Sequence, residues 1–180
     1  MAEELETALV LVLTEHSPEL SALHAQFQPE VAAKGIPLHI TLLYPFVPPR
    51  AITPELISTL RCFFAERHSP SFELTRIDTF PGVLWAAPEP AEELVRLIEA
   101  LARLFPHTPP YGGAYADVVP HATLAERPGG AGRERIAAQL RAATAPLLPV
   151  SCELTYASLL EEHEPDRWRE RERFPFATPR

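Results

Sequence analysis

The chain has 180 residues, of which 46% are hydrophobic, and a formal net charge of −8. This length fits one compact domain over residues 1–180, and no apolar run reaches the ~20 residues that a membrane-spanning helix needs. The negative charge argues against strong, sequence-independent binding to a nucleic-acid duplex, which requires many phosphate contacts. The acidic start, Met1 to Glu4, differs from the basic start of a signal peptide, so we expect a cytoplasmic monomer without membrane attachment.

Strand and helix patterns follow one another in the same order in both halves of the chain. The first half is predicted to contain a strand over 5–14, a helix from Ser17, a loop over 28–38, a strand from His39, a helix from Thr53 to about His68, and a strand over 71–80. The second half is predicted to contain a strand over 83–86, a helix over 91–105, a strand from His121, a helix over 132–143, a strand over 150–160, a turn over 161–166 and an edge strand over 167–176.

The same four-residue pattern, His-x-Thr-Leu, occurs once in each half. The first copy begins at His39 and includes Thr41, and the second begins at His121 and includes Thr123. In a β-strand, alternation places His and Thr on one face and the residues between them on the other. Each strand would therefore present an imidazole and a hydroxyl side by side, supported by apolar residues.

A second repeated pattern has almost the same spacing. Ser-Phe-Glu-Leu-Thr at 71–75 recurs as Ser-Cys-Glu-Leu-Thr at 151–155, an offset of 80, whereas the two histidines are offset by 82. Two pattern pairs with nearly equal offsets indicate a duplication, with units of approximately 5–80 and 83–176. The predicted fold is α+β: a bilobal duplicated unit with pseudo-two-fold symmetry, antiparallel sheets lining a central cleft, and helices packed outside.

Two histidines that face one cleft can perform acid–base catalysis without a metal or cofactor. Imidazole titrates near pH 6.5, so one ring can accept a proton while the other donates one. Displacement at phosphorus requires a base on the attacking oxygen and an acid on the leaving oxygen, and threonine hydroxyls can hold the charged non-bridging oxygens. The residues therefore favour a phosphodiester-cleaving site, and no His, Cys, Asp or Glu cluster has ligand spacing typical of zinc.

The two motif segments resemble the signature strands of the two-histidine phosphoesterase superfamily, which includes the 2′-5′ RNA ligase-like cyclic phosphodiesterases. The segments that carry the resemblance are 35–46 and 118–125, and it extends over nearly the whole chain. It implies that His39 donates a proton to the leaving 3′-oxygen, that His121 activates water, and that Thr41 and Thr123 bind the phosphate. The implied substrate is a small nucleotide or RNA end with a 2′,3′-cyclic phosphate. Many relatives continue the second motif with Leu-Ala-Arg, whereas here Glu126 precedes Arg127, so no arginine role is transferred.

Other interpretations remain open at this stage. The four motif residues can be structural histidines and ordinary β-forming threonines, and the protein can be an RNA 2′-5′ ligase or a phosphate-binding module without turnover. Tyr111 and Tyr115 can stack on a nucleobase or only pack a loop. The remaining histidines are interpreted as one core residue, His24, and solvated ones elsewhere. Four arginines alternate along the last strand and form either a phosphate-binding stripe or, as we favour, a charged sheet edge: Arg167, Arg169, Arg171 and Arg173.

Overall fold

The computed structural model describes residues 4–114, 117–126 and 132–177. Within them, the strands are β1 (Thr7–Val12), β2 (His39–Leu43), β3 (Ser71–Phe80), β4 (Val83–Glu89), β5 (Ala122–Glu126), β6 (Val150–Glu153), β7 (Tyr156–Glu164) and β8 (Arg167–Pro175). The helices are α1 (Pro18–Phe27), α2 (Pro29–Ala33), α3 (Pro54–Ala65), α4 (Glu92–Leu104) and α5 (Arg133–Thr144), with short 3₁₀ turns η1 (Pro49–Ala51) and η2 (Pro110–Gly113).

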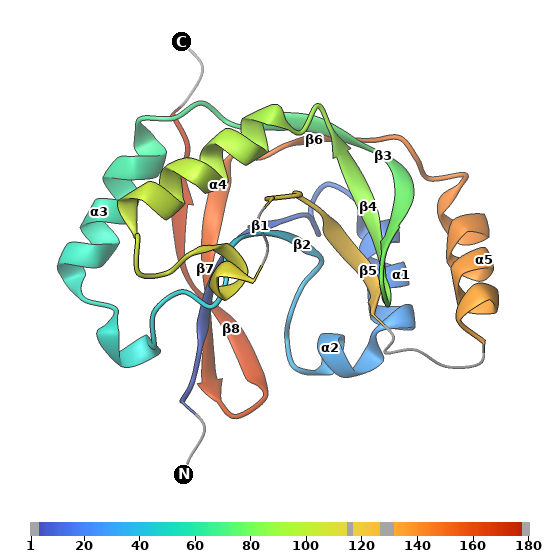
Figure 1. Cartoon of the computed structure of the whole chain (residues 1–180), viewed down its shortest axis with the longest axis horizontal. Helices are drawn as coiled ribbons and strands as arrows, with labels where there is room; N and C mark the ends of the chain where they lie inside the picture. The colour runs from blue at the N-terminus through green and yellow to red at the C-terminus, as the bar shows by residue number, and fades with distance from the viewer. Residues whose placement is uncertain (1–3, 115–116, 127–131, 178–180) are drawn as a thin grey trace.

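All eight strands belong to one curled antiparallel sheet, in the order β6-β3-β4-β5-β2-β1-β7-β8 (Figure 1). The predicted mixed α+β class with antiparallel strands is confirmed, and the two halves share this sheet. In Figure 1, α3 and α4 lie beside one half of the sheet, and α1, α2 and α5 lie beside the other. The two motif strands β2 and β5 are neighbours at its centre, so the fold brings together histidines that are far apart in the sequence.

The first residues of α1 and α3 explain where these two helices begin. Ser17 Oγ accepts a hydrogen bond from the Leu20 amide, and Thr53 Oγ1 accepts one from the Leu56 amide. In both helices a proline follows the cap, where its missing N–H costs nothing. These two predicted starts are confirmed.

Three predicted segments need correction. The strand expected over 150–160 is two strands, because the chain changes partners: β6 pairs with β3, and β7 pairs with β1 and β8. The turn expected over 161–166 is shorter, since β7 continues to Glu164. The loop expected over 28–38 contains α2, a helix of five residues, which is too short to show a helical period in the sequence.

Each repeated pattern pairs with its own copy across the sheet. Ile40 of the first motif lies opposite Ala122 of the second, and Phe72 lies opposite Cys152. In the strand order, a two-fold axis between β2 and β5 exchanges β1 with β4 and β7 with β3. This axis relates Ile40 to Ala122 but does not relate Phe72 to Cys152, whose strands β3 and β6 lie on the same side of it. The repeat units 5–80 and 83–176 therefore stay a prediction from the sequence pattern.

The helices cross between the halves. Helix α1, from the first half, packs on the motif strand β5 of the second, and α4, from the second half, packs on β2 of the first. The main hydrophobic core lies under these helices and includes Ile40, Leu42 and Leu124. A smaller cluster of Ala8, Val10 and Leu160 lies apart from it, and Val10 is the β1 neighbour of Thr41. The halves are thus interlocked, and the motif face lies opposite the main core.

Candidate active site

The two motif strands alternate as their residue types predict. His39 and Thr41 are half-buried, whereas Ile40 and Leu42 are buried in the core. His121 and Thr123 are likewise half-buried, and Ala122 and Leu124 are buried. Both histidines and both threonines therefore lie on the sheet face opposite the main core.

The register of β2 and β5 brings these four side chains together. Ile40 pairs with Ala122 in an antiparallel ladder, and the same register places His39 opposite Thr123, and Thr41 opposite His121. Directly opposite residues on one face of a sheet have Cβ atoms about 4.5–5.5 Å apart. The four residues form a quadrilateral, with the histidines at one pair of diagonal corners and the threonines at the other; we call this group the motif quartet.

Each imidazole is held by the backbone in the same way. Nδ1 of His39 lies 2.7 Å from the Pro37 carbonyl oxygen, and Nδ1 of His121 lies 2.7 Å from the Val119 carbonyl oxygen. A carbonyl oxygen only accepts, so Nδ1 donates in both rings, and Nε2 carries the lone pair when the ring is neutral. The atom available to exchange a proton is therefore Nε2 in both histidines.

The surroundings of both imidazoles disfavour a positive charge on either ring. Burial lowers the pKa of His39, and the nearby His121 lowers it further. Burial also lowers the pKa of His121. Because a charge on one ring disfavours a charge on the other, the pair resists holding two protons.

The surroundings of the two histidines differ. The His121 ring packs among three aromatic rings, with centroid separations of 5.1 Å to Phe80, 5.7 Å to Trp85 and 5.9 Å to Tyr111. The His39 side lies instead within electrostatic range of His24, a buried histidine on α1 whose pKa is lowered to about 4, first by burial and then by His39. The predicted core position of His24 is confirmed.

Sequence reasoning missed two of the three aromatic residues beside His121. Phe80 and Trp85 belong to the β3–β4 hairpin, and Trp85 is the cross-strand partner of Thr123. The Pro81-Gly82 pair predicts this hairpin, but a turn signal does not indicate which strand lies next to β4. Tyr111, which the sequence singles out, does lie against His121, whereas Tyr115 and Arg127 fall outside the described residues.

The arginines of the last strand mostly form pairs at the sheet edge. Strand β8 ends the strand order, which confirms the predicted edge. Arg169 and Arg171 both bind Glu161, at 2.6 and 2.7 Å, and Arg173 pairs with Glu170. These contacts support the interpretation as a charged edge.

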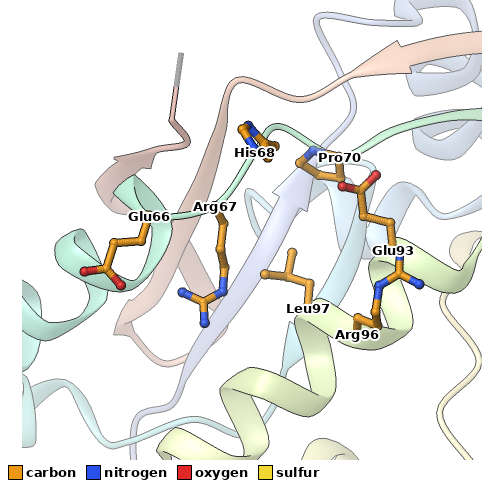
Figure 2. Close-up of a pocket in the computed structure, with 7 residues that line it drawn as sticks. All are labelled: Glu66, Arg67, His68, Pro70, Glu93, Arg96 and Leu97. Atoms are coloured by element: carbon orange, nitrogen blue, oxygen red, sulfur yellow. The ribbon is translucent and has the colours of Figure 1, made fainter. Parts of the chain in front are cut away.

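A separate hollow of about 270 Å³ lies between the end of α3 and α4 (Figure 2). His68, Arg67 and Arg96 are among its lining residues, and none of the motif quartet is.

Among the described residues, no group of three His, Cys, Asp or Glu side chains is placed to hold a metal ion. None of the helices in the described ranges has the length and apolar character required to cross a bilayer.

The fold and the family are shown by comparison with known proteins. E. coli LigT complexed with NADP⁺ has a similar structure, with a TM-score of 0.58 at 16% identity over 98% of this chain and 100% of that chain. TT0787 of Thermus thermophilus has a TM-score of 0.59 at 22% identity, over 95% and 97% of the two chains. A crystal structure described as a phosphoesterase has a TM-score of 0.54 at 18% identity, over 98% and 100%. No curated protein matches the chain.

The sequence model of the 2′-5′ RNA ligase superfamily matches residues 12–166. The chain therefore belongs to this superfamily, a group of ligase and phosphoesterase enzymes, as the paired motifs predicted. E. coli LigT itself has been solved with NADP⁺, 3′-AMP, ATP and phosphate.

Proposed function

We propose that this protein is a phosphoesterase that opens 2′,3′-cyclic phosphates, on a small nucleotide or at an RNA end, by acid–base catalysis with two histidines. The observation that carries the proposal is the motif quartet: two imidazoles on diagonal corners of one sheet face, each with Nδ1 fixed by a carbonyl oxygen and Nε2 left for proton exchange. Binding alone would not require a matched acid and base.

The proposed reaction assigns one task to each histidine. His121 Nε2 takes a proton from water while the water oxygen forms a new bond to phosphorus. His39 Nε2 gives its proton to the 3′-oxygen as the bond between that oxygen and phosphorus breaks. One ring must start neutral and the other protonated, and the repulsion between the rings disfavours the state in which both are protonated.

The threonines have a separate role in this proposal. The Thr41 and Thr123 hydroxyls donate to the non-bridging oxygens, whose negative charge increases in the transition state. Their diagonal placement provides one donor on each strand, next to a histidine of the opposite strand. This chemistry uses only side chains of the chain itself, so we propose that no metal or other cofactor takes part.

Ligation through a 2′-5′ bond is the second candidate, favoured by the family to which the chain belongs. In this reaction the 5′-hydroxyl of a second RNA end replaces water: His121 takes its proton as the 5′-oxygen bonds to phosphorus, and His39 protonates the 3′-oxygen as its bond to phosphorus breaks. The nucleotide complexes of LigT support a nucleotide as the ligand class, because the two proteins share a fold.

An assay in the presence of EDTA tests the proposal. Purified protein is incubated with each 2′,3′-cyclic nucleotide and with oligonucleotides that end in a cyclic phosphate, and the product is identified as a 2′- or 3′-phosphate. We expect hydrolysis that survives exhaustive chelation. Loss of activity on chelation with recovery on adding one divalent ion would contradict the metal-independent mechanism, and ligated product in place of hydrolysis would favour the second candidate.

A further inference from the structure

A groove of about 390 Å³ runs along β4 beside His121. Its lining includes Trp85, Ala87 and Glu89 of β4, and Val119 and Pro120, which directly precede His121. Trp85 pairs with Thr123 and Ala86 with Ala122, so the same register places Ala87 opposite His121. The groove therefore opens on the face that carries the motif quartet and continues from His121.

The walls of the groove are largely apolar and contain several prolines. Val119 is 41% exposed, the highest value among the exposed large hydrophobic residues of the described chain. Prolines at positions 88, 90 and 120 also line the groove, and proline offers a flat ring surface without a backbone N–H. The volume lies within the range of about 300–1,000 Å³ that is typical of small-molecule sites. An aromatic ring suits such walls, because it buries a large apolar area.

The charged groups of the groove favour a ligand edge that donates hydrogen bonds. Glu89 and Glu92 contribute two carboxylates, and Arg76 contributes one guanidinium. Arg76 is already ion-paired with Glu89 and, at 3.6 Å, with Asp78. The excess negative charge disfavours a second phosphate, whereas carboxylate oxygens accept hydrogen bonds from amino groups.

We propose that this groove is the nucleobase subsite, and that Glu89 selects a base with an exocyclic amino group. The inference rests on the proposed function, since it places the phosphate at the motif quartet and the base along β4. A comparison of cytosine with uracil tests this selection directly. They have nearly the same shape, but cytosine presents an amino donor where uracil presents a carbonyl acceptor, and a carboxylate discriminates between these groups.

The test compares cytidine and uridine 2′,3′-cyclic phosphates with the unmodified protein, Glu89→Gln and Glu93→Gln. Glu93 is the matched control, because it lies on α4 and lines the hollow in Figure 2 rather than this groove. We expect kcat/KM of the unmodified protein to favour cytidine by about tenfold or more, as good base contacts do. Glu89→Gln should abolish most of this preference, since an amide can both donate and accept, and Glu93→Gln should retain it.

Two further measurements separate the subsite from the reaction. Ribose 2′,3′-cyclic phosphate, which has no base, should be hydrolysed equally by the unmodified protein and Glu89→Gln. Calorimetric titration with cytidine and uridine 2′-monophosphates, the products of the proposed reaction, gives the same base comparison without turnover. The subsite is overturned if cytidine and uridine substrates have equal kcat/KM and their monophosphates bind with equal affinity, and if Glu89→Gln changes neither result. This conclusion holds even if hydrolysis is observed. A base preference in calorimetry without hydrolysis of any cyclic phosphate leaves the subsite standing and contradicts the proposed function instead.

Discussion

The two motif strands have the same local structure but different surroundings. In both, His and Thr share a face, and Nδ1 of the histidine donates to the carbonyl two residues earlier. His121 then packs among aromatic rings from two other segments, whereas His39 lies near a buried histidine on α1. Gly35, with a φ of +86°, precedes β2, whereas the segment before β5 contains positive φ values at Gly112 and Gly113.

The two copies of the motif thus share a strand geometry but not an environment. The strand geometry is repeated because His-x-Thr-Leu alternates in the same way in both copies. The electrostatic and packing environment is not repeated, because it comes from residues of other elements. The two imidazoles are thereby chemically distinguishable, which agrees with the proposed assignment of one acid and one base.

The largest effect is expected from replacing either histidine. His39→Ala and His121→Ala should each lower turnover of a cyclic phosphate by about 10²–10⁴-fold, and the double variant should fall far short of additivity because the two act together. His163→Ala, at the β7–β8 hairpin, is the control. For the unmodified protein, kcat/KM should be bell-shaped with both limbs on the acid side of the usual imidazole value, since burial lowers the pKa of both rings.

Each single variant should lose one limb of this profile, and the limb that disappears identifies the role. Loss of the alkaline limb marks the acid, because its proton is lost as pH rises. Loss of the acidic limb marks the base, because it becomes protonated as pH falls. An unchanged rate and profile in His39→Ala would show that this residue has no catalytic role.

Gly35→Ala should strongly destabilise the fold beside β2. A Cβ at this position would lie 2.4 Å from the Trp168 carbonyl oxygen, in a backbone conformation with positive φ. Strain and overpacking together should cost about 3 kcal/mol of unfolding free energy. Gly132→Ala has the same sign of φ, but among the described residues no atom lies within 4 Å of the added Cβ, so it should cost only about 1 kcal/mol. Denaturant unfolding of both variants measures the difference, and equal losses would rule out the contact with Trp168.

His24 should make the protein less stable in acid. Its pKa is about 4 in the folded state, against 6.5 when unfolded, so the unfolded chain binds more protons between these values. The contribution of His24 is therefore fully present above pH 6.5 and decreases as pH falls toward 4, by at most about 3 kcal/mol. Unfolding free energies over this range should fall less steeply in His24→Leu than in the unmodified protein, and parallel curves would contradict the prediction.

The smallest effects are expected from the threonines. Thr41→Val and Thr123→Val each remove one hydrogen bond to a charged oxygen, worth roughly 1.5–3 kcal/mol of transition-state stabilisation. Thr59→Val, on the exposed face of α3, is the control for the same change in shape. Single-turnover rates measure both losses, and they show whether Thr41 and Thr123 of the motif quartet contribute equally. A loss in only one of the two variants would mean that the phosphate is held from one strand.

The sequence by itself determined which face of each motif strand carries the histidine and threonine, because the period of a β-strand is a local property. It also indicated the helix starts at Ser17 and Thr53, where a capping side chain and a proline act within one turn. The α+β class and the family followed from such local patterns.

Only the tertiary structure decided what lies beside each motif. The pairing of β2 with β5, the division of 150–160 into β6 and β7, and the exchange of α1 and α4 between the halves depend on contacts between distant segments. The aromatic rings around His121 and the groove lined by Glu89 arise in the same way. A strand's own alternation fixes its faces but not its neighbours, because strand order is set by the packing of the whole sheet and its helices.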